Sequence, residues 1–120
     1  MELKNLIKVQ KEFDSNHFGD IKLTPERLLY LMTCLAGENG ELANLVKKYY
    51  RDKVQNYRVT TDQDKDFLAL MKEELIDNFI YILILSYLLE VDLEKGFFSK
   101  LNKNEERFKN VSKTYKLKND

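Results

Sequence analysis

The sequence of 120 residues contains very little cysteine, histidine, proline or glycine. Cys34 is the only cysteine, which excludes an intramolecular disulfide and a cysteine-based zinc site. His17 is the only histidine, which argues against a histidine-rich metal centre and against Ser-His-Asp chemistry. One proline and four glycines are too few for the frequent turns of a β-sandwich or barrel. The composition therefore favours long helices.

The net charge also excludes some classes of partner. Twenty basic and twenty acidic residues cancel, so no overall field attracts the chain to nucleic acid or to an anionic membrane. The most apolar run, residues 79–89, is too short to span a bilayer, and the first residues lack the apolar core of a signal peptide. We expect a cytoplasmic protein with no membrane association and no stable nucleic-acid partner.

Hydrophobic periodicity predicts four helices. We expect them over residues 2–14, 25–51, 67–90 and 93–109. The polar segment 52–66 lacks helical periodicity and is expected to be a loop. Thr24 before Pro25, and Asp92, are expected to cap the helices that follow them.

These elements predict an all-α fold, a four-helix-type bundle in one domain of residues 1–109. Residues 110–120 are expected to form a basic, flexible tail. Because residues 79–89 are apolar on nearly all sides, we expect a second copy to complete the bundle in a homodimer or homotetramer.

Carboxylates interrupt two apolar stripes that should face neighbouring helices. The stripe of the second helix comprises Leu31, Leu35, Glu38, Leu42, Leu45 and Tyr49, with Glu41 on the next ridge. The stripe of the third helix comprises Leu70, Glu74, Asp77, Tyr81, Ile84 and Leu88. If the two stripes face each other, Glu38, Glu41, Glu74 and Asp77 converge.

Convergence of four carboxylates requires protons, buried Lys or Arg partners, or a divalent cation to neutralise them. Two carboxylates about 5 Å apart repel by roughly 3 kcal/mol at an effective dielectric constant near 20. Oxygen ligands without histidine or cysteine suit a hard cation, Mg²⁺ or alternatively Mn²⁺. The alternative is that the edges of the stripes are wet and that Lys47, Lys48 and Lys72 form ordinary surface bridges with the acids.

The fourth predicted helix carries a polar group in its apolar stripe. Asn104 interrupts the stripe, and Lys100 and Arg107 flank it on the same face. Amide and cationic donors suit a polyphosphate. The alternative is that Lys100 and Arg107 simply face solvent.

These motifs, taken in order, resemble the MazG-like nucleotide pyrophosphohydrolases. They are LAGENGELA at 35–43, EELID at 73–77, VDL at 91–93 and K-x-x-x-N-x-x-R-F at 100–108. The resemblance implies an all-α oligomer that converts an NTP or dNTP to the monophosphate and pyrophosphate with Mg²⁺, and nucleotide-pool clean-up is the role it suggests.

The resemblance also implies roles for the residues of these motifs. Glu38, Glu41, Glu74 and Asp77 would hold the metal, and Lys100, Asn104 and Arg107 would contact phosphate or sugar. Either Glu38 or Glu41 would accept the proton of the attacking water.

Base recognition and one rival function stay open in the sequence. No tryptophan is present, so the candidates for base contact are other rings: His17, Phe18, Tyr49 and Tyr81. The rival is a non-enzymatic helical interaction module with an acidic surface.

Overall fold

The structure is a computed structural model that describes residues 2–54 and 61–119. Within those ranges it contains four helices and no strand, which confirms the predicted all-α fold. The helices are α1 (Leu3–Phe18), α2 (Pro25–Val54), α3 (Thr61–Leu88) and α4 (Leu93–Asn119).

The chain divides into two compact units. The first, Met1–Leu89, holds α1, α2 and α3, and the second, Glu90–Asp120, holds α4. Completion of a four-helix bundle by α4, or by a second copy of the chain, stays a prediction.

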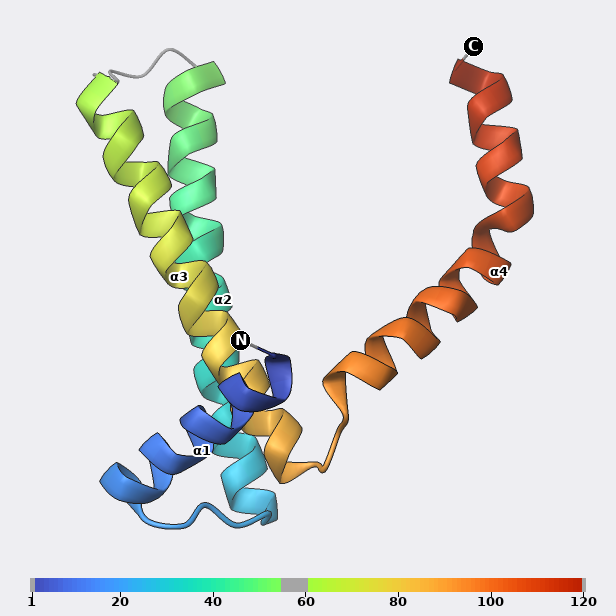
Figure 1. The fold of residues 1–120 in the computed structure, drawn as a ribbon. Helices are drawn as coiled ribbons and strands as arrows, with labels where there is room; N and C mark the ends of the chain where they lie inside the picture. Colours follow the sequence, from blue (N-terminus) through green and yellow to red (C-terminus); the bar gives the residue numbers. More distant parts are fainter. Residues whose placement is uncertain (1, 55–60, 120) are drawn as a thin grey trace. The chain divides into compact units, whose positions relative to one another are not determined.

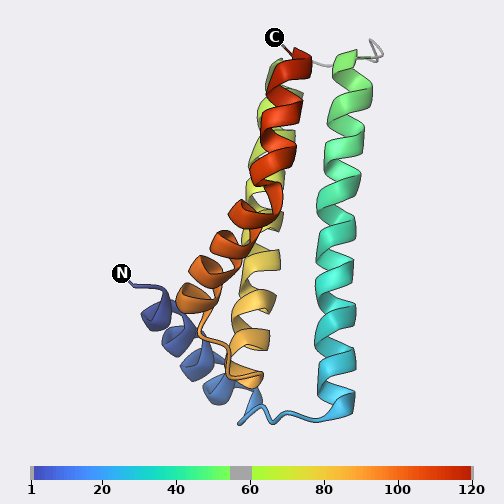
Figure 2. The ribbon, with the colours of Figure 1, turned by 90° about the vertical axis from the view of Figure 1, so that its right-hand side faces the viewer.

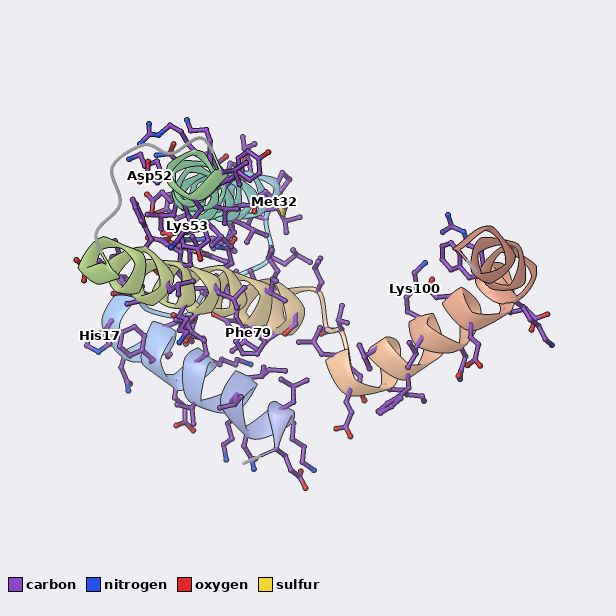
Figure 3. The ribbon with its side chains drawn as sticks, turned by 90° about the horizontal axis from the view of Figure 1, so that it is seen from above. His17, Met32, Asp52, Lys53, Phe79 and Lys100 are labelled. Carbon is purple, nitrogen blue, oxygen red and sulfur yellow. The ribbon has the colours of Figure 1, made fainter. Side chains whose placement is uncertain are left out.

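In the first unit, α2 and α3 run antiparallel and pack against each other, and α1 packs on α3 (Figure 1). Turning the molecule shows α1 beside the C-terminal half of α3 again (Figure 2). Seen from above, α3 lies between α2 and α1 (Figure 3). α3 is therefore the helix on which the other two are assembled.

The core lies between α2 and α3. Leu31 of α2 and Ile84 and Leu88 of α3 are at most 6% exposed and form one cluster. Partly buried side chains, Ile21, Ile80, Tyr81, Leu85 and Tyr87, pack around it. The core is small, and large apolar side chains such as Leu29 and Leu75 are 71% and 58% exposed.

The predicted stripe of α2 faces inward, since its positions from Leu31 to Tyr49 are all buried or half-buried. The predicted stripe of α3 is wrong at its first position, because Leu70 is 46% exposed while Phe67 and Met71 are half-buried. A helix turns every 3.6 residues, so a stripe drifts by one position over a few turns.

The predicted boundaries need correction around the second connection and at the C-terminus. Helical structure covers 52–54 and 61–66, parts of the expected loop, while 55–60 lie outside the described residues. A polar segment can be helical without burying a face, and periodicity detects only the buried face. α1 continues to Phe18, and α4 continues to Asn119 rather than ending near 109. Flexibility of the tail stays a prediction.

Both predicted N-caps are confirmed. The Thr24 hydroxyl accepts a hydrogen bond from the backbone N–H of Arg27 at 3.0 Å, at the start of α2. The Asp92 carboxylate accepts one from the N–H of Lys95 at 3.0 Å, at the start of α4. Each cap satisfies a backbone donor that the helix itself leaves unpaired.

Replacing the α2 cap should destabilise the first unit. We expect Thr24→Ala to lower the free energy of unfolding by about 1 kcal/mol, measured by urea denaturation. The matched control is Thr33→Ala within α2, where the hydroxyl only bonds back to the Leu29 carbonyl at 2.7 Å. That control should be neutral or slightly stabilising, because Ala is the better helix former. Equal losses in the two variants would contradict the assigned cap.

Candidate metal centre and adjoining cavity

Three carboxylates meet between α2 and α3. Glu38 and Glu41 come from α2 and Glu74 from α3, and one oxygen of each lies within 4.8 Å of the others. Glu38 and Glu74 are half-buried, whereas Glu41 is exposed. The i, i+3 spacing puts Glu38 and Glu41 on one side of α2, and packing of the two stripes brings Glu74 opposite them.

Two oxygens of this cluster are buried without a hydrogen-bond partner. They are Oε2 of Glu38 and Oε2 of Glu74. In the described part of the chain, no ion pair joins Glu38, Glu41 or Glu74 to Lys47, Lys48 or Lys72. The surface bridges with these three lysines, considered as an alternative, are therefore not seen among the described residues.

The neighbouring carboxyl groups raise the pKa of one member of the cluster. The adjacent carboxyl group of Glu38, partial burial and the nearby Glu41 raise the pKa of Glu74 from 4.5 to about 7. A shift in this direction reflects the cost of ionising all three carboxyl groups together.

The donor set fits a hard divalent cation. The available ligand atoms are carboxylate oxygens, two of which are buried and lack any partner. Mg²⁺ and Mn²⁺ prefer such ligands, and a doubly charged ion would remove the repulsion that now keeps Glu74 protonated. The residues present thus suit the metal that the sequence predicted.

Asp77 lies one turn beyond Glu74 and is half-buried. It lines a cavity together with Glu38, so the fourth predicted carboxylate lies beside the cluster and faces the same space. The cavity has a volume of about 350 Å³, which is within the range of small-molecule sites.

All three helices of the first unit contribute to this cavity. α1 supplies Gln10, Phe13, Asp14 and Phe18. The other lining residues are Ile21, Arg27, Tyr30, Leu31, Glu38, Asp77, Ile80, Tyr81 and Ile84. The cavity is acidic where it meets the cluster and mostly apolar and aromatic elsewhere, the pattern expected of a site for an amphipathic ligand.

A buried polar link attaches α1 to α3. Asp14 is 3% exposed and accepts hydrogen bonds from Gln10 Nε2 at 2.9 Å and from the Tyr87 hydroxyl at 2.7 Å. Burial and this bond to Asp14 raise the pKa of Tyr87, so the phenol stays protonated and remains a donor. The Lys11 ammonium lies 5.8 Å from the centre of the Tyr87 ring.

The four rings predicted to contact a base are not all at the cavity. Phe18 and Tyr81 line it. His17, labelled on α1 in Figure 3, has its ring centre 4.4 Å from that of Phe13 and 6.3 Å from that of Phe18. Tyr49 is half-buried three turns beyond Glu38 and is not among the lining residues.

Tyr81 has its own electrostatic setting. Burial, the neighbouring Cys34 thiol and the nearby Glu38 raise its pKa to about 12. The hydroxyl therefore stays protonated and remains a hydrogen-bond donor.

The predicted phosphate-binding residues belong to the second unit. Lys100, Asn104 and Arg107 follow one another at four and three residues along α4, and the Arg107 guanidinium lies 4.8 Å from the centre of the Phe108 ring. Contact of these three residues with phosphate stays a prediction, because the two units are described separately.

Apart from Phe18, sequence reasoning missed the wall that α1 contributes. Gln10 and Asp14 continue the stripe of Leu3 and Ile7 at helical spacing, so a carboxylate interrupts an apolar stripe on α1 as well. The rule applied to the second and third helices would have found Asp14. Arg27 carries no such signal, since it lies in a helix start rich in charged residues.

Comparison with known proteins agrees with this geometry. The sequence matches the family model of the MazG nucleotide pyrophosphohydrolase domain over residues 26–112. The chain belongs to this family. No curated protein and no solved structure matches it. The MazG match covers α2, α3 and most of α4, and so includes every predicted metal ligand. None of the helices in the described residues is long and apolar enough to cross a membrane.

The raised pKa of Glu74 predicts a specific pH dependence of stability. Folded metal-free protein keeps this proton between about pH 4.5, the ordinary value, and about pH 7. The stability contributed by proton uptake is therefore full below pH 4.5 and is lost as the pH rises through 7. In EDTA, we expect the Tm of wild type to fall relative to that of Glu74→Gln as the pH is raised from about 5 to about 8.

The control for this measurement is Glu73→Gln, which changes an exposed carboxylate next in sequence. Its Tm should follow the wild-type pH profile in circular dichroism melts. Parallel profiles for wild type and Glu74→Gln would show that Glu74 does not hold the proton.

Proposed function

We propose that this MazG-family chain is a Mg²⁺-dependent pyrophosphohydrolase that converts an NTP or dNTP to the monophosphate and pyrophosphate, with nucleotide-pool clean-up as a possible role. The observation that supports the proposal most is the pair of buried, unpartnered oxygens of Glu38 and Glu74 within a group of three carboxylates. Glu38, Glu41, Glu74 and Asp77 would hold the cation, with Mn²⁺ as a possible substitute. When bound, the cation would neutralise the triphosphate and lower the pKa of bound water.

The side chains of the site have separate tasks in this proposal. Glu38 or Glu41 accepts the proton of the attacking water. Lys100, Asn104 and Arg107 contact the phosphates or the sugar and stabilise charge on the non-bridging oxygens. These three residues come from α4, and the proposal for them rests on their pattern along that helix.

The cavity beside the carboxylates suits the nucleoside. A triphosphate held through the cation at Glu38 and Asp77 would leave the rest of the substrate next to the cavity that these two residues line. Phe13, Phe18 and Tyr81 offer flat surfaces on which a base can pack at little cost in conformational entropy.

We also propose that the enzyme is a homodimer or homotetramer. Leu29, Met32, Leu75 and Ile76 of the first unit are between 50% and 71% exposed, more apolar surface than a single chain normally leaves in water. Sedimentation equilibrium should give the mass of two or four chains, and the mass of one chain would contradict the proposal.

Removing single carboxylates should abolish hydrolysis without unfolding the protein. We expect Glu41→Gln and Asp77→Asn to lower kcat/KM for pyrophosphate release by at least about 100-fold, because each removes a ligand charge from the cation. Glu73→Gln, on the exposed side of α3, should retain wild-type turnover. Near-wild-type rates in Glu41→Gln and Asp77→Asn, with helicity retained, would contradict the assignment.

The rival function, a non-enzymatic module with an acidic surface, makes a different prediction. A specific cation site should raise Tm with MgCl₂ well beyond the effect of NaCl at the same ionic strength. Equal shifts with the two salts, together with no turnover of any nucleotide, would favour the module.

A further inference from the structure

The cavity holds a carboxylate that the proposed hydrolysis does not use. Asp14 lies in the α1 wall, 3% exposed, and lines the same cavity as Glu38 and Asp77. It is not part of the group of carboxylates that can share a cation. A buried charge is costly, so its place at a ligand-sized cavity calls for an explanation.

Two hydrogen bonds fix the orientation of this carboxylate. Gln10 donates to Oδ1 at 2.9 Å, and Tyr87 donates to Oδ2 at 2.7 Å. Both partners are donors, so they orient the group as an acceptor. An ionised carboxylate has about four acceptor positions and no donor, so each oxygen can still accept a further hydrogen bond.

Among the residues that line the cavity, Asp14 can serve as a polar contact for the base. Phe13, Phe18 and Ile80 are apolar lining residues, while Glu38 and Asp77 line the side at which the cation would bind. Arg27 is the one cation among the described lining residues, and its guanidinium lies 5.9 Å from the centre of the Tyr30 ring. A ligand in the cavity therefore finds a fixed acceptor in Asp14 and a donor in Arg27.

We propose that Asp14 makes the enzyme select nucleotides whose base carries an exocyclic amino group, namely cytosine, adenine or guanine. The inference rests on the function proposed above. The amino group can donate to the carboxylate. Uracil replaces the amino group of cytosine, and hypoxanthine replaces that of adenine, with a carbonyl, which is a second acceptor and is repelled by the carboxylate. Hypoxanthine has only a hydrogen where guanine has its amino group, so the donor is lost. A ligand without the amino group leaves the acceptor position of the buried carboxylate that faces it unfilled, and this cost disfavours binding of that ligand.

The test compares pairs of nucleotides of which one carries the amino group and the other lacks it. For wild type we expect kcat/KM for dCTP to exceed that for dUTP, and kcat/KM for at least one of ATP or GTP to exceed that for ITP, by at least about 10-fold. Asp14→Asn should lower at least one preference about 10-fold or reverse it, because its amide can donate to a carbonyl. The ratio of two substrates on one preparation does not depend on the fraction of folded enzyme.

Two variants separate specificity from structure. Glu12→Gln changes an exposed carboxylate on the same helix and should keep the wild-type ratios. Tyr87→Phe removes the donor that positions Oδ2, and should lower the ratios less than Asp14→Asn does. Melting curves of all three variants report the separate contribution of the link to stability.

The outcomes distinguish this inference from the proposed function. Hydrolysis without an amino preference, or a preference that survives in Asp14→Asn, overturns the inference and leaves Asp14 as a structural link between α1 and α3. If no nucleotide is hydrolysed, the proposed function fails. Calorimetric binding of the α,β-imido analogues of dCTP and dUTP then decides the inference, since equal Kd values, or no binding of either, overturn it.

Discussion

Repulsion among the carboxylates between α2 and α3 is the constraint on which the first unit depends. The oxygens of Glu38, Glu41 and Glu74 lie within 4.8 Å of one another, on the faces through which the two helices pack. The same packing that buries Leu31 against Ile84 thus forces like charges together. A shared proton reduces the repulsion in the metal-free chain, and the pKa of Glu74, raised to about 7, is its signature. A divalent cation offers much fuller compensation, and the fold thereby links its stability to its proposed chemistry.

Much of this arrangement was predictable because it is local. The hydroxyl of Thr24 and the carboxylate of Asp92 cap their helices by accepting a hydrogen bond from a backbone N–H three residues further along the chain. Acids inside apolar stripes marked the helix faces that meet. What the sequence could not provide was the placement of α1, which depends on a hydrogen bond between residues 73 apart, Asp14 and Tyr87. Periodicity describes one helix at a time, so it could identify the stripe on α1 but not the cavity that forms where α1 lies on α3. For the same reason, the partners of Lys100 and Arg107 stay predictions.

The two sides of the cavity offer different kinds of interaction to a ligand. Near Glu38 and Asp77 it is dominated by charge, which suits a polyphosphate and its cation. Against α1 it is mostly apolar, with the carboxylate of Asp14 held in place by Gln10 and Tyr87. In the proposed function, charge interactions would fix where the substrate binds, and a few oriented hydrogen bonds would decide which substrate fits.

The helix that carries Asp14 also lies outside the family match. The MazG match starts at residue 26, after α1 has ended. If Asp14 selects the substrate as proposed, changes in α1 could alter substrate choice without changing the proposed metal ligands on α2 and α3. A chimera that exchanges only this N-terminal helix is therefore the natural route to a redesigned enzyme.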